Sequence, residues 1–199
     1  MKLNPLSHPN AIVVDDFYAN PDEVRDLAMA QQFFSHPKVH RGQRTHDRFL
    51  FPGLKEKFEQ LMCLKITRWE EDQVNGVFQL CIAGDQVVYH SDDQKYAGVV
   101  YLTPNAPPEG GTSVYRSRAN KMRSVQEAEK HGFNTQEAIE AMYRNKLFDP
   151  TAWEMVDTFG NVYNRLVIWD ARVVHAATAY FGHNIGDGRL FQMFFFDAE

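Results

Sequence analysis

From residue 77 onward, the sequence is dominated by short runs in which apolar and polar residues alternate. A period of two is typical of β-strands, whose successive side chains point to opposite faces of a sheet. The expected strands cover residues 77–82, 87–90, 96–103, 112–116, 165–169, 173–177 and 189–196. Many short strands at this spacing predict a mainly β (α+β) protein with a double-sheet, cupin-like jelly-roll core.

Helices are expected before and within this β region. A short strand at 11–14 precedes the helix-start signal Asn20-Pro21-Asp22-Glu23, which predicts a helix to about residue 32. A second amphipathic helix is expected at 54–64. The stretch between them, 35–53, is interpreted as a loop with exposed histidines, namely His36, His40 and His46.

Residues 117–160 interrupt the β pattern. They contain two helical segments, 126–130 and 135–145, and Thr135 is the expected cap of the second. Because this stretch is too short to bury a core of its own, we interpret it as an insertion. The expected organisation is one domain over 1–199, with N-terminal helical support in 1–75, the jelly-roll core in 76–116 and 161–199, and the helical insertion in 117–160.

Composition excludes several classes of protein. The formal net charge of −5 argues against a general nucleic-acid binder. No apolar run approaches the ~20 residues that a membrane helix needs, and the first residues lack the apolar region of a signal peptide. We therefore expect a cytoplasmic protein with no membrane partner. Cys63 and Cys81 are interpreted as reduced packing residues.

A His-x-Asp motif at His90 and Asp92 is the main candidate site. In an extended segment, residues two apart point to the same side, so the imidazole and the carboxylate converge. His175, in an otherwise apolar expected strand, is the candidate third ligand. Two histidines and one carboxylate on one face of a metal are the ligand set of non-haem Fe(II) oxygenases. The alternatives are surface residues at a strand end for the motif, and a core residue for His175.

Two further residues favour a site between the sheets. If the last strand alternates, Arg189 shares a mostly apolar face with Phe191, and a buried guanidinium needs an anion. The alternative is an arginine that points to solvent. Tyr101 is expected on the strand after the His-x-Asp motif, and a buried phenol normally finds a hydrogen-bond partner. Its alternative is a core tyrosine bonded to backbone.

Together these stretches resemble the Fe(II)- and 2-oxoglutarate-dependent dioxygenases, most closely the prolyl-4-hydroxylase-like branch. The matching segments span about residues 77–196: His90-Ser91-Asp92, Ala97 to Leu102, Gly110-Gly111-Thr112, Arg165 to Ala176, and Gly188-Arg189. The opening stretch Ile12 to Phe17, followed by a helix, is also similar to the start of that family.

The resemblance implies a double-stranded β-helix with Fe(II) on His90, Asp92 and His175. It also implies that Arg189 pairs with the C5 carboxylate of 2-oxoglutarate and that Tyr101 donates a hydrogen bond to the same cosubstrate. With O2, such a centre hydroxylates its substrate. Because related halogenases lack the carboxylate ligand, Asp92 favours hydroxylation.

Some relatives carry Ser or Thr two residues after the arginine. This chain has Phe191 there, which leaves room for another 2-oxoacid. The substrate is unidentified, and it is either a small molecule or a protein segment, a prolyl residue included.

Two other functions are compatible with these residues. One is a cupin-like module that binds a metal or a carboxylate without redox chemistry. The other is a zinc hydrolase, which is disfavoured because no general-base glutamate lies beside the ligands and Arg189 would be unexplained. A basic cluster in the insertion is interpreted either as a lid that attracts an acidic substrate or as a solvated face balanced by Glu127 and Glu129; it comprises Arg116, Arg118, Lys121 and Arg123.

Overall fold

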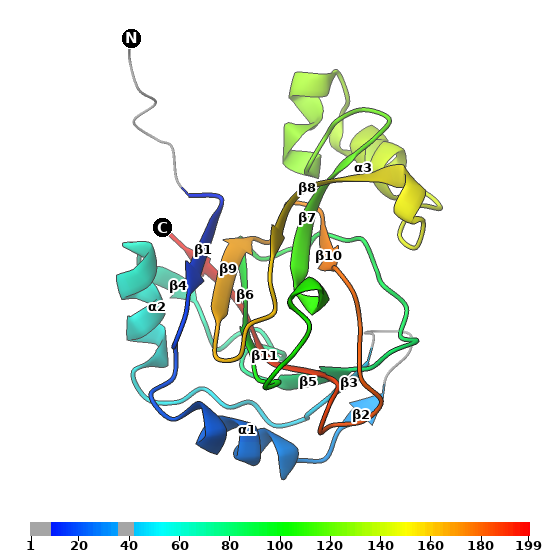
Figure 1. The fold of residues 1–199 in the computed structure, drawn as a ribbon. Helices are drawn as coiled ribbons and strands as arrows, with labels where there is room; N and C mark the ends of the chain where they lie inside the picture. The colour runs from blue at the N-terminus through cyan, green and yellow to red at the C-terminus, as the bar shows by residue number, and fades with distance from the viewer. Residues whose placement is uncertain (1–8, 36–41) are drawn as a thin grey trace.

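The computed structural model describes residues 9–35 and 42–199, and it contains two antiparallel sheets (Figure 1). The larger sheet has eight strands in the order β1-β9-β6-β11-β5-β3-β2, with β4 paired to β11. Its strands are β1 (Ala11–Val14), β2 (Phe34–Ser35), β3 (Gln43–Arg44), β4 (Ile66–Arg68), β5 (Phe78–Cys81), β6 (Tyr96–Tyr101), β9 (Leu166–Asp170) and β11 (Arg189–Ala198). The smaller sheet has the order β10-β7-β8 and consists of β7 (Thr112–Ser117), β8 (Trp153–Phe159) and β10 (His175–Ala177). The expected mainly β architecture is confirmed.

Helical segments lie in the N-terminal part of the chain, in the loop before β7 and in the insertion. The α-helices are α1 (Pro21–Met29), α2 (Leu54–Met62) and α3 (Thr135–Tyr143), and the 3-10 segments are η1 (Pro108–Gly110), η2 (Val125–His131) and η3 (Pro150–Ala152). Helix α1 begins at Pro21 with acidic residues in its first turn, as predicted, but it ends three residues earlier than expected.

Strand β11 divides its side chains between two faces of the large sheet. Leu190, Phe194 and Phe196 join the core on the side of α1 and α2, whereas Phe191 and Met193 join a second core on the opposite side. The alternation expected for this strand is therefore confirmed. It results from the period-two geometry of an extended chain that is buried on both faces.

Helix α2 covers the first of these faces. Its Phe58 is fully buried, with its ring centroid 4.9 Å from that of Phe194 and 5.4 Å from that of Trp69. Burying an aromatic side chain of this size contributes about 1.5–3 kcal/mol. The helix thus covers one face of the large sheet, and the second core lies on the opposite face.

The insertion packs against the smaller sheet and extends beyond it (Figure 1). Met122 and Met142 from the insertion share a third core with Trp153, Tyr115 and Val174. This shared core agrees with the argument that the insertion is too short to bury a core of its own.

Two details of the insertion differ from the sequence prediction. The cap of α3 is Asn134, not Thr135: the Asn134 side chain accepts a bond from the Glu137 amide, and the Glu137 side chain accepts one from the Asn134 amide. This reciprocal pair satisfies two amides that a helix start leaves unpaired. In addition, β8 lies within 117–160 and pairs with β7, so the end of this range is part of a sheet.

The strand expected at 87–90 is wrong. Within it, only His90 forms a bridge, with His175, and the Tyr89 amide donates to the Leu147 carbonyl of the insertion at 2.8 Å. Because its backbone groups bond to two different segments, this stretch cannot continue a ladder with one neighbour.

The loop prediction for 35–53 is wrong at β3, and strands β2 and β4 were not predicted. Each is only two or three residues long, too short for a period-two pattern to be recognised. His46 is exposed as expected, whereas His36 and His40 lie outside the described residues, as do residues 1–8. Cys63 and Cys81 are both free thiols, as expected, but only Cys81 is a packing residue, because Cys63 is exposed. Within 9–35 and 42–199, no helix has the length and apolar character needed to cross a membrane.

Candidate metal centre

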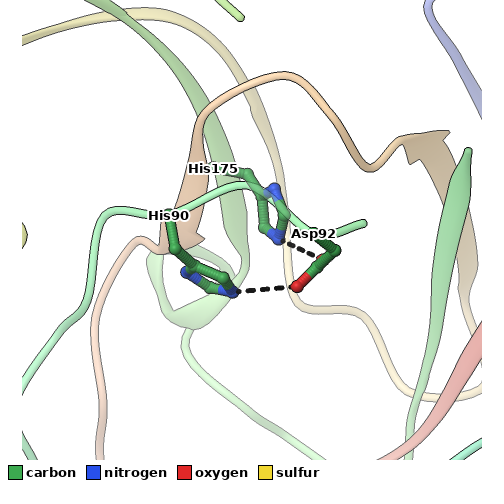
Figure 2. Close-up of side chains that lie close together, drawn as sticks. All are labelled: His90, Asp92 and His175. Atoms are coloured by element: carbon green, nitrogen blue, oxygen red, sulfur yellow. Dashed lines mark ion pairs between the residues drawn. The ribbon is translucent and has the colours of Figure 1, made fainter. Parts of the chain in front are cut away.

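Three predicted side chains converge in one place: those of His90, Asp92 and His175 (Figure 2). Their ligand atoms all lie within 4.8 Å of one another. The backbones of His90 and His175 exchange two hydrogen bonds, of 3.1 and 2.8 Å, and the Asp92 amide donates to the Ala171 carbonyl at 2.8 Å. Backbone pairing therefore brings the His-x-Asp motif onto β10, although the motif is not in a regular strand.

Both imidazoles are oriented by a backbone carbonyl two residues before them. Nδ1 of His90 lies 3.0 Å from the Val88 oxygen, and Nδ1 of His175 lies 2.9 Å from the Val173 oxygen. A carbonyl only accepts hydrogen bonds, so each Nδ1 carries the proton and each neutral ring presents an Nε2 lone pair. Histidines that bind metals are commonly held by such a bond on the other nitrogen.

The two Nε2 atoms face the Asp92 carboxylate. Nε2 of His90 is 3.6 Å from Oδ1, and Nε2 of His175 is 3.2 Å from Oδ2. Oδ2 is buried and has no hydrogen-bond donor among the described residues when the histidines are neutral. Three acceptors that face one another need a cation between them, so the donor set fits a divalent metal of the kind bound by two histidines and one carboxylate.

The pKa values reflect this crowding. Burial, followed by repulsion from His175, lowers the pKa of His90. Burial also opposes charge on His175 and Asp92, but their mutual attraction outweighs it, so the pKa of His175 is raised and that of Asp92 is lowered. Without a metal, the neighbouring Asp92 carboxylate therefore favours protonation of His175.

The insertion forms a hydrogen bond to the His-x-Asp motif. The Tyr143 hydroxyl of α3 donates to Oγ of Ser91, the residue between the two candidate ligands, at 2.7 Å. Burial raises the pKa of Tyr143, which keeps this phenol protonated as a donor. Sequence reasoning missed this contact because no local pattern relates residue 143 to residue 91.

Arg189 lies at the start of β11 and is only 3% exposed, which excludes the solvent-facing alternative. Its Nε donates to the Gly110 carbonyl at 2.8 Å, and its Nη2 lies 3.2 Å from the Gly111 carbonyl and from Oγ1 of Thr112. The guanidinium also stacks over the Phe191 ring, 4.3 Å from its centroid. These neutral partners fix the side chain but leave its charge without a carboxylate among the described residues.

Tyr101 lies beside Arg189 and its partners on the Gly110–Thr112 turn, and together these residues form the Arg189 cluster. Tyr101 is fully buried, and its hydroxyl lies 2.8 Å from Oγ1 of Thr112, so its partner is a side chain rather than the backbone. Thr112 is paired with Ala177 in the ladder between β7 and β10, in which His175 pairs with Val114. The register of this small sheet thus connects the Arg189 cluster to His175.

Two glycines allow the Arg189 cluster to form. A Cβ atom at Gly111 would overlap the Phe159 carbonyl, and one at Gly110 would overlap the Phe181 ring. Only glycine lets the backbone approach this closely, so that its carbonyls can accept bonds from Arg189.

Trp169 is a further polar group of the site that sequence reasoning did not single out. Its ring meets that of His175 edge-on, with centroids 5.2 Å apart, and its buried Nε1 has no hydrogen-bond partner among the described residues. In the sequence, only its position in the expected strand 165–169 could have indicated that Trp169 lies near the candidate site.

The basic cluster of the insertion is largely paired with acids. Arg116 forms two bonds to Glu154, at 2.8 and 3.0 Å, Lys121 lies 3.1 Å from the same carboxylate, and Arg123 pairs with Glu127. These contacts favour the interpretation of the cluster as a solvated face over its interpretation as a lid. The acids that balance it are Glu127, as expected, and Glu154 instead of the expected Glu129.

Residues 85–196, more than half of the chain, match the family of unknown function DUF6445. The matched segment contains all five predicted site residues, namely His90, Asp92, Tyr101, His175 and Arg189. Among curated protein sequences, none matches this chain significantly.

Solved structures with the same fold include HygX from Streptomyces hygroscopicus with nickel, 2-oxoglutarate and hygromycin B bound. It has a TM-score of 0.57 and 10% identity, covering 92% of this chain and 81% of HygX. HygX with nickel and 2-oxoglutarate bound gives a TM-score of 0.53 and 12% identity, with the same coverage. A prolyl-4-hydroxylase from Pseudomonas putida matches with a TM-score of 0.46 and 17% identity, over 96% of this chain and 92% of its own. The expected resemblance to Fe(II)- and 2-oxoglutarate-dependent oxygenases is confirmed at the level of the fold.

Proposed function

Because this chain belongs to the DUF6445 family, whose function is unknown, we propose its activity from the site itself. The protein is an Fe(II)- and 2-oxoglutarate-dependent oxygenase that hydroxylates its substrate. The observation that carries this proposal is the set of three mutually facing acceptors on His90, Asp92 and His175.

The fold supports the same proposal. We interpret the two antiparallel sheets as a double-stranded β-helix, or jelly roll, with the site between them. HygX shares the fold and has been solved with nickel and 2-oxoglutarate bound. A metal and 2-oxoglutarate are therefore the groups that we assign to this chain.

In the proposed site, His90, Asp92 and His175 hold Fe(II), with Nδ1 of each histidine anchored to a carbonyl. Arg189 binds the C5 carboxylate of 2-oxoglutarate, and Tyr101 donates its phenolic hydrogen to the same molecule. A buried guanidinium without a carboxylate partner gains most from such an anion. Because burial raises the pKa of Tyr101, although Arg189 opposes this, the phenol stays protonated and able to donate.

With its cosubstrate, the bound iron would supply O2-dependent hydroxylation, in which 2-oxoglutarate is decarboxylated to succinate and one oxygen atom enters a substrate C–H bond. Asp92 occupies the position that halogenases leave open, so hydroxylation is the expected outcome. The apolar side chains around Arg189 and Tyr101 keep water from the cosubstrate's far carboxylate. The substrate is a small molecule or a residue of a protein segment.

Anaerobic titration of the Fe(II)-loaded protein with 2-oxoglutarate tests this proposal. We expect a weak visible metal-to-ligand charge-transfer band in the wild type and none in His175→Ala. A zinc-retaining protein that shows no band would instead indicate a non-redox binding module or a hydrolase.

A further inference from the structure

A second arginine lies on the same face of the large sheet as Arg189. Arg44 of β3 pairs with Gln79 of β5, Gln79 pairs with Phe191 of β11, and Phe191 pairs with Tyr101 of β6. Directly paired residues of neighbouring strands place their side chains on the same face. Arg44 therefore belongs to the same row of side chains as Tyr101, the proposed cosubstrate contact.

The hydrogen bonds of the row confirm this placement. Nε of Arg44 donates to Oε1 of Gln79 at 2.6 Å, and Nε2 of Gln79 lies 3.3 Å from Sγ of Cys81. Cys81 belongs to the same core cluster as Tyr101 and Phe191. The Arg44 side chain is thus directed along the inner face of the sheet.

Arg44 is also electrostatically close to the metal centre. Burial lowers its pKa, and the nearby groups that oppose this effect include Cys81 and Asp92. In the strand register, Gln79 and Cys81 pair with Phe191 and Arg189 of β11, so the Arg44 side chain, bonded to Gln79, lies on the face that carries the proposed cosubstrate contacts.

The contacts of Arg44 leave most of its donors available. Among the described residues, its hydrogen-bond partner is Gln79, and no carboxylate lies within ion-pair distance. Arg189, by contrast, uses two of its nitrogens on the Gly110–Thr112 turn. A partly buried arginine held by one neutral amide is positioned by the protein but not neutralised by it, and an incoming anion would supply the missing partner.

We propose that Arg44 binds an anionic group of the substrate, a carboxylate or a phosphate, while Arg189 holds the cosubstrate. This inference rests on the proposed oxygenase function and gives it a substrate class. Arg44 lies outside the segment that matches the DUF6445 family, so the family match does not bear on this role.

Saturation-transfer NMR with small anions tests the proposal on the full chain loaded with diamagnetic Zn(II) and saturated with 2-oxoglutarate, so that Arg189 is occupied. The probes are acetate and methylphosphonate, with acetamide as the uncharged control. We expect saturable binding of at least one anion, weakened about tenfold or more in Arg44→Gln, because the anion loses a charged hydrogen-bond donor. Arg44→Lys should bind with intermediate affinity, since it keeps the charge but loses the planar fork.

Arg118→Gln is the matched control, because Arg118 is an exposed arginine of the insertion without a carboxylate partner among the described residues. Anion binding that is absent from the wild type, or equally strong in Arg44→Gln, would overturn the role of Arg44. A tenfold loss of 2-oxoglutarate affinity in Arg44→Gln would also overturn it, by assigning Arg44 to the cosubstrate. The 2-oxoglutarate signals in the same spectra separate the two proposals: if they show no binding to the wild type, the oxygenase function itself is wrong.

Discussion

At the scale of single residues, metal binding at the candidate site competes with protonation of its histidines beside Asp92. Nε2 of His175 lies 3.2 Å from Asp92, and both residues are withdrawn from solvent. The attraction of Asp92, which outweighs the effect of burial, raises the pKa of His175. A metal can bind there only if it displaces the proton, because an imidazole binds a metal through its neutral form.

Metal affinity should therefore rise with pH. Below the raised pKa of His175, each pH unit should weaken binding by about tenfold per displaced proton, and affinity should level off above it. Anaerobic Fe(II) titration against a competing chelator at several pH values between 6 and 8 measures this slope. A flat profile would show that His175 carries no proton in the metal-free protein.

Single residues of the candidate site differ in how far the sequence alone could predict them. His90, Asp92 and His175 could be predicted because their donor set is chemically specific and two of them are only two residues apart. Arg44 and Trp169 could not, because an arginine in an apparent loop and a tryptophan in a strand have many ordinary roles. Their position relative to the candidate site depends on strand pairing, which only the three-dimensional structure supplies.

At the scale of elements, the insertion contacts the candidate metal centre and is positioned to support it. Helix α3 and the segment after it bond to the stretch 89–91, through Tyr143 and the Leu147 carbonyl. The period-two pattern predicted β6, β7, β9 and β11, whose faces are clearly divided. It did not reveal β8, because all six residues after Trp153 are exposed or only partly buried along an edge, and the strand shows no clear apolar alternation.

Tyr143→Phe tests this supporting role. Removing the hydroxyl leaves Ser91 without its donor, so the loop that carries His90 and Asp92 should become less well positioned. We expect metal affinity to fall by about tenfold, the lower end of the range for residues that orient ligands indirectly. The free energy of unfolding should fall by only about 1 kcal/mol.

Tyr163→Phe is the matched control for this variant. It also removes one phenolic hydrogen bond, to Asp22 at 2.6 Å, but on the outer side of the molecule. Comparable losses of metal affinity in the two variants would contradict a specific role for Tyr143. Unfolding by denaturant, measured on both variants, separates stability from metal binding.

At the scale of the whole molecule, the proposed site joins the two sheets. His175 belongs to the smaller sheet and Arg189 to the larger one, while His90 and Asp92 lie in the segment between β5 and β6. A metal held by His90, Asp92 and His175, with 2-oxoglutarate extending from it to Arg189, would add a connection between the two sheets. It would act beside the bonds that Arg189 and Tyr101 make to the Gly110–Thr112 turn. Ligands that bind only the folded state stabilise it in proportion to the logarithm of their concentration.

Metal and cosubstrate should therefore raise the melting temperature in two steps. At a hundredfold excess over its dissociation constant, each ligand contributes about 2.7 kcal/mol, or roughly 5–10 °C for a chain of this size. Differential scanning fluorimetry with Zn(II), which avoids oxidation, measures both steps. In His175→Ala both should disappear, because the cosubstrate needs the metal, whereas Arg189→Gln should keep the metal step and lose most of the cosubstrate step. An undiminished second step in Arg189→Gln would mean that 2-oxoglutarate, if it binds, has its far carboxylate elsewhere in the fold.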